Sequence, residues 1–99
     1  MECRHTNAKL RRMQEDPRYR GGLAPDVVKA FRKRVQLIRA ARDERDFYAL
    51  KSLHYEKLKG GRSHQRSMRL NDQWRLIVEL EKSSRGTVVV IRDIEDYHR

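Results

Sequence analysis

The chain has 99 residues and a formal net charge of +10, with 37% hydrophobic and 38% charged residues. This length suits one domain, residues 1–99, and no apolar run reaches the roughly 20 residues that a membrane span needs. A single cysteine, Cys3, excludes an intramolecular disulfide and a cysteine-ligated zinc site, and no apolar signal segment follows Met1. These features favour a cytoplasmic protein.

The positive charge extends along the whole chain, from Arg4 to Arg99, with acidic residues interleaved. This distribution is typical of a folded basic domain and not of a disordered arm. Basic domains of this size commonly bind nucleic acid, and an acidic protein partner would also suit the charge. A membrane-surface role is disfavoured because no helical segment pairs a Lys/Arg face with a Trp/Phe face.

Helices are predicted in the first half, after a short segment, Met1–His5, that is either an edge strand or irregular. A short helix is predicted over residues 8–13, with Thr6 or Asn7 as its N-terminal cap. It should end before Pro17, because the residue that precedes a proline avoids the helical conformation. A second helix begins at Ala24-Pro25-Asp26, since proline suits the first helical turn. Its apolar stripe is formed by Val27, Phe31, Val35 and Ile38.

A short helical piece is expected over residues 43–50, with Phe47 and Leu50 three positions apart and both facing inward. The pattern then changes to the alternation of strands. Residues 67–70 and 74–80 predict a hairpin, and residues 87–91 (TVVVI) predict a central strand. Helices followed by an antiparallel meander indicate an α+β fold with the helices on one face of the sheet.

The register of the hairpin follows from its apolar pattern. A three-residue loop, residues 71–73, places six apolar side chains on one face: Met68, Leu70, Trp74, Leu76, Val78 and Leu80. This register also sets Arg69 directly opposite Arg75 on the other face, where like charges repel. A carboxylate or phosphate between the two would stabilise the pair, and Arg is well suited to such an anion site. The alternative is that both side chains point into water.

Three segments of the second half form an ordered set of motifs: residues 54–61 (HYEKLKGG), 66–75 (RSMRLNDQWR) and 94–98 (IEDYH). Together they resemble the HigB branch of the RelE/ParE toxin superfamily, over a stretch from about Val27 to His98. The resemblance implies the RelE-like α+β fold, in which N-terminal helices pack on a twisted antiparallel sheet of three to four strands.

The resemblance also implies a function. The well-understood relatives are toxins of type II toxin–antitoxin modules that cleave mRNA on the ribosome. We therefore expect a ribosome-dependent mRNA endonuclease that inhibits translation until a HigA-like helix-turn-helix antitoxin neutralises it. The implied partners are this antitoxin, the ribosome and mRNA, with operator DNA contacted only through the antitoxin complex. No membrane and no cofactor are expected.

Metal-independent RNA cleavage uses the neighbouring 2′-hydroxyl as nucleophile and needs a base, an acid and cations for the phosphate. The four histidines are scattered and show no metal-ligand spacing. His98 follows Asp96 by two residues, so on an extended chain the carboxylate could orient the imidazole.

By resemblance, the segment Asp96-Tyr97-His98 lies at the active cleft, with His98 or His54 as the proton-transfer group. Arg69 and Arg75 would stabilise the phosphate, and Tyr97 could stack on a base. The expected RNA-binding residues are Lys57, Lys59, Arg62 and Arg66.

Simpler interpretations stay open for each residue. Tyr97 and His98 could form a packed chain end, His54 could be a structural histidine, and the lysines could belong to a solvated face. Two alternatives also stay open for the whole protein. One is a non-catalytic family member that binds the antitoxin as a co-repressor, and the other is a ParE-type toxin that inhibits DNA gyrase.

Overall fold

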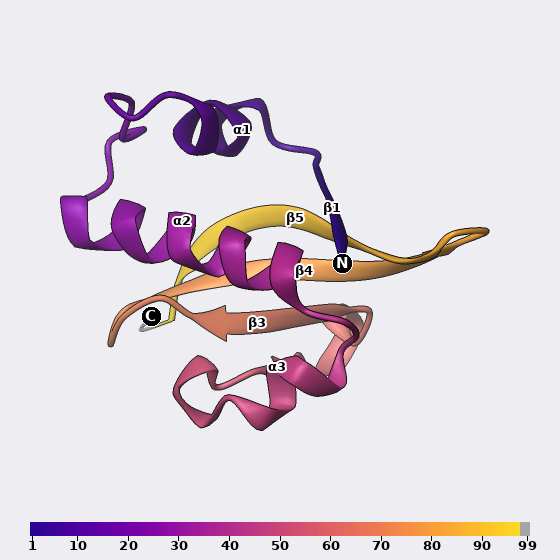
Figure 1. Ribbon diagram of the computed structural model, residues 1–99. Coiled ribbons are helices and arrows are strands. Elements are labelled where there is room, and N and C mark those ends of the chain that lie inside the picture. The colour runs from indigo at the N-terminus through magenta and orange to yellow at the C-terminus, as the bar shows by residue number, and fades with distance from the viewer. Residues whose placement is uncertain (98–99) are drawn as a thin grey trace.

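A five-stranded sheet forms the centre of the computed structural model, which describes residues 1–97 (Figure 1). In spatial order the strands are β1 (Glu2–His5), β5 (Gly86–Asp96), β4 (Trp74–Ser83), β3 (Gln65–Arg69) and β2 (Glu56–Lys57). β1 runs parallel to β5, and the other neighbours are antiparallel. The predicted α+β fold is confirmed, but the sheet is mixed and has more strands than the predicted three to four, because both short edge segments pair.

The helices are α1 (Ala8–Glu15), α2 (Pro25–Ala40) and α3 (Arg45–Ala49). α2 crosses one face of the sheet and α1 packs beside it, whereas α3 lies near β3 (Figure 1). Two single-turn 3₁₀ segments follow, η1 (Lys51–Leu53) and η2 (Gly60–Arg62). Within residues 1–97, no helix has the length and apolar character that crossing a bilayer requires.

The helix boundaries follow the predicted local chemistry. The Asn7 carboxamide oxygen accepts hydrogen bonds from the backbone N–H groups of Lys9 and Leu10, at 3.0 and 3.3 Å, so Asn7 is the cap of α1. Pro25 is the first residue of α2. The predicted apolar stripe of α2 is confirmed, because each of its four residues is buried: Val27, Phe31, Val35 and Ile38.

The predicted hairpin register is also confirmed. Met68 pairs with Leu76 and Arg69 with Arg75, and the Leu70 N–H donates to the Trp74 carbonyl at 2.9 Å. The loop of residues 71–73 is held by Asn71, whose side-chain oxygen accepts from the Trp74 N–H. Its side-chain amide donates to Asp26 at the start of α2, which ties the hairpin loop to the helix layer.

One inward position was predicted wrongly. Phe47 is fully buried, but Leu50 is 43% exposed. α3 ends at Ala49, and Leu50 has an extended backbone. The three-residue spacing that brings two helical side chains to one face therefore does not apply to Leu50.

Candidate functional site

The face of the sheet opposite α2 carries a cavity of about 190 Å³. Side chains alternate along a strand, so while Met68 and Leu76 enter the core, Ser67 and Arg75 face the other way. The lining comes from the η2 region, β3, β4 and the end of β5. It consists of Leu58, Arg62, Ser67, Arg75, Ile77, Glu95, Asp96 and Tyr97.

Arg75 and Tyr97 form a stacked pair in the lining of this cavity. The guanidinium carbon of Arg75 lies 3.8 Å from the centroid of the Tyr97 ring, and only 11% of the arginine side chain is exposed. Arg75 Nη1 lies 3.5 Å from Glu56 Oε1 but makes no hydrogen bond within residues 1–97. A fixed guanidinium with an unused donor can bind a phosphate oxygen.

Arg69 lies opposite Arg75, as predicted, but it does not line the cavity. It forms an ion pair with Asp72 in the hairpin loop, and its Nε donates to the Asn71 carbonyl at 3.3 Å. The two arginines therefore each have a carboxylate of their own, Asp72 for Arg69 and Glu56 for Arg75. This arrangement reduces the repulsion that their register creates.

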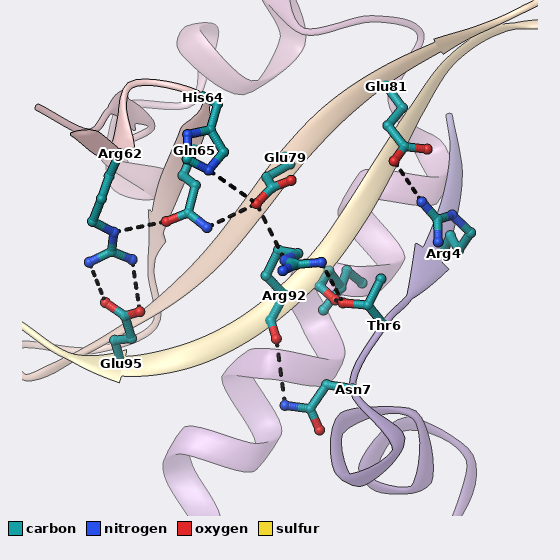
Figure 2. Close-up of polar contacts among 11 residues, drawn as sticks. Arg4, Thr6, Asn7, Arg62, His64, Gln65, Glu79, Glu81, Arg92 and Glu95 are labelled. Carbon is teal, nitrogen blue, oxygen red and sulfur yellow. Dashed lines mark hydrogen bonds and ion pairs between the residues drawn. The ribbon is translucent and has the colours of Figure 1, made fainter. Parts of the chain in front are cut away.

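A polar network fixes the η2 segment to the face of the sheet opposite α2, which we call the open face (Figure 2). The Arg62 guanidinium makes two hydrogen bonds to the Glu95 carboxylate, at 2.9 and 2.8 Å, and its Nε donates to Gln65 at 2.8 Å. Gln65 in turn donates to Glu79, which also pairs with Arg92 at 3.3 Å. The charge of Arg62 is therefore largely committed to Glu95, and together they form one side of the cavity.

The end of β5 is attached to the hairpin loop. The Gln73 side chain donates to Asp96 Oδ2 at 3.0 Å, and the Tyr97 N–H donates to the Gln73 carbonyl at 2.5 Å. These bonds hold Asp96 and Tyr97 at the cavity. His98, the leading candidate for proton transfer, lies outside the described residues.

The remaining predicted residues do not line this cavity. His54 is exposed and ends η1 in a left-handed conformation, with φ of 48°. Lys57 and Lys59 are exposed on either side of Leu58. Arg66 packs toward α3, where its Nε lies 3.3 Å from Glu44 Oε2.

Glu44, which pairs with Arg66, also contacts the buried Tyr55. The Tyr55 hydroxyl donates to Glu44 Oε2 at 2.7 Å. Burial and this hydrogen bond raise the pKa of Tyr55 far above its usual value. The phenol therefore stays protonated and serves as a structural donor.

Of the predicted site residues, the structure brings together Arg62, Arg75, Asp96 and Tyr97 around the cavity. Sequence reasoning missed Leu58, Ser67, Ile77 and Glu95. The hairpin register could have identified Ser67, because it pairs with Ile77 on the face of the two arginines. Within residues 1–97, no group of three His, Cys, Asp or Glu side chains is arranged to hold a metal ion.

Comparison with known proteins agrees with this architecture. The family model described as "RelE-like toxin of type II toxin-antitoxin system HigB" matches residues 4–98. The YoeB/ParE toxin from Agrobacterium tumefaciens superposes with a TM-score of 0.61 at 15% identity, covering 99% of this chain and 100% of that chain. YafQ from Escherichia coli strain BL21(DE3) gives 0.57 at 10% identity, covering 97% and 92%. These two likenesses show the fold, and comparison with the curated proteins finds no significant match.

Proposed function

The chain belongs to the HigB-like family of RelE-like toxins of type II toxin–antitoxin systems, and we propose that it is a ribosome-dependent mRNA endonuclease. As a type II toxin it has an antitoxin as its partner. We further propose that this antitoxin is a HigA-like helix-turn-helix protein, that operator DNA is contacted only through their complex, and that the toxin acts on translating ribosomes in the cytoplasm.

The observation that carries this proposal is the Arg75–Tyr97 pair in the cavity, with Asp96 beside it. In the proposed reaction the 2′-oxygen forms a bond to phosphorus while the bond from phosphorus to the 5′-oxygen breaks. The products are a 2′,3′-cyclic phosphate and a 5′-hydroxyl. A base takes the 2′ proton, an acid donates a proton to the leaving oxygen, and Arg75 stabilises the charge on the phosphate.

The proton-transfer group in this proposal is His98. The position of Asp96 and Tyr97 at the cavity supports His98, the next residue along the chain, over His54, which does not line the cavity. Asp96 would orient the imidazole, and Tyr97 would offer its half-exposed ring to an unpaired base. Arg69, which pairs with Asp72 and lies opposite Arg75, would also help to stabilise the phosphate.

Binding to RNA is supported by the distribution of cations near the cavity and by the net charge of +10, because phosphate contacts dominate such affinities. Lys57 and Lys59 are exposed beside the cavity, so we assign to them the main contacts with the phosphate backbone of the RNA. Arg62 and Arg66 already pair with carboxylates, so their contributions require an exchange of partners.

Inducible expression in a bacterial host tests the proposal. Wild type is compared with His98→Ala and with Arg85→Ala, a control in the exposed β4–β5 turn. We expect growth arrest and new mRNA 5′ ends for wild type and the control, and neither for His98→Ala. Absence of arrest and of new ends in wild type would favour an antitoxin-binding protein without catalysis. Arrest with intact mRNA and impaired gyrase supercoiling would favour a ParE-type toxin.

A further inference from the structure

The lining of the cavity includes a buried hydroxyl group that has no hydrogen-bond partner among residues 1–97. Ser67 is 1% exposed, and its Oγ makes no hydrogen bond to any residue of the described part of the chain. On the open face its cross-strand neighbours are Glu56 and Ile77. A buried hydroxyl that forms no hydrogen bond is unfavourable in the free protein, and a ligand that bonds to it recovers that free energy.

The walls around this hydroxyl suit a flat ring. Leu58 and Ile77 supply apolar surface, and Tyr97 supplies an aromatic ring backed by the Arg75 guanidinium. The volume of about 190 Å³ lies below the roughly 300–1,000 Å³ of pockets for drug-sized ligands. The cavity therefore suits a single ring system and not a larger ligand.

The charges of the lining disfavour a phosphate deep in the cavity. Glu95 contributes a carboxylate, and its two hydrogen bonds from Arg62 commit that cation. Beyond Arg75, an anion would meet apolar walls and the carboxylates of Glu95 and Asp96 there. A nucleobase has apolar faces and a polar edge, which matches apolar walls above a polar floor. Proteins commonly read RNA through unstacked bases held in this way.

We propose that the cavity receives one unstacked base next to the cleaved bond, and that Ser67 determines specificity by hydrogen bonding to its edge. This inference rests on the proposed function as an mRNA endonuclease. Arg75 then lies between the base in the cavity and the phosphate that is cleaved. A serine hydroxyl can both donate and accept a hydrogen bond, so it can recognise either an acceptor or a donor on the edge of a base.

The test uses the purified full chain, translating ribosomes and an mRNA that presents all four bases at each codon position. The 5′ ends are mapped for wild type, Ser67→Ala and Ser67→Val, with Ser84→Ala in the exposed β4–β5 turn as the control. Wild type and control should prefer one base at one position relative to the cut. Ser67→Ala should weaken that preference about threefold to tenfold, the range of one neutral hydrogen bond. Ser67→Val should lower cleavage everywhere, because it fills the cavity.

Thermal unfolding separates recognition from a structural role. Ser67→Ala should melt at or above the wild-type temperature, because it removes a buried hydroxyl that is not hydrogen-bonded to any described residue. If it folds poorly, the near-isosteric Ser67→Cys should show the same loss of preference. Cleavage by wild type with an unchanged preference in Ser67→Ala and Ser67→Cys would overturn the base pocket and leave the proposed function standing. No cleavage by wild type would overturn both.

Discussion

Replacing Arg75 separates the contribution of this side chain to stability from its contribution to activity. Arg75→Ala removes the stacking on Tyr97, which is worth about 0.5–2 kcal/mol. It also removes the 3.5 Å ion pair with the half-exposed Glu56, worth about 0–1 kcal/mol. Against these losses, it eliminates the buried Nη1 donor, which forms no hydrogen bond to any of residues 1–97, and this gives back about 1–3 kcal/mol. The net change in the free energy of unfolding should stay within about 2 kcal/mol.

The expected loss of activity is much larger than the loss of stability. Removing one donor from a developing oxyanion costs about 10²–10³ in rate. Arg75→Lys keeps the charge but not the planar fork, so it should fall between wild type and Arg75→Ala. Arg4→Ala, which removes a surface ion pair with Glu81, is the matched control and should change neither quantity appreciably.

The assay combines thermal melting with initial rates of mRNA cleavage on translating ribosomes. A change of 1 kcal/mol shifts the melting temperature of a domain this size by about 4–8 °C, so the fold should remain intact at assay temperature. Cleavage by Arg75→Ala within tenfold of wild type would refute the assignment of Arg75 to the phosphate. Loss of the melting transition would show that Arg75 is required for folding and would refute the energy estimate.

Three further predictions concern stability. Phe31→Ala should lower the free energy of unfolding by about 3–5 kcal/mol in urea titrations, because the ring is fully buried. The raised pKa of Tyr55 means that the folded state binds the phenolic proton more tightly, so stability should fall above about pH 10 and fall less in Tyr55→Phe. Urea midpoints between about pH 8 and 11 measure this difference. Burial and the nearby Arg11 lower the pKa of His5, so stability should fall as pH drops below about 6.5. The same titration between about pH 5 and 8 should be flatter for His5→Gln.

The hairpin register was predictable because one face of the hairpin is apolar. Shifting the pairing by one residue would have turned Met68 and Leu76 out of the core, so the pattern left one acceptable loop. From that register alone, Arg69 could be placed opposite Arg75. The same register places Ser67 beside Ile77, and both residues line the cavity.

The opposite wall of the cavity was not predictable in this way. The β4–β5 register shifts at Ile77/Val78, and the shift decides that Glu95 lies opposite Arg75. β5 contains both a continuous apolar run and a charged end, and neither indicates where a bulge occurs. The ion pairs of the basic residues were not predictable either, because their carboxylates come from segments that are distant in the sequence. Glu44 pairs with Arg66, and Glu95 pairs with Arg62.

Cleavage of mRNA by the purified protein, with and without ribosomes, tests the central claim most directly. A defined mRNA is incubated with the chain alone, with idle ribosomes and with translating ribosomes, and its 5′ ends are mapped. Cuts are expected at fixed positions within codons only when ribosomes translate, and they should disappear when the antitoxin is added. Intact mRNA on translating ribosomes, with the protein in excess and fully folded, would contradict this claim.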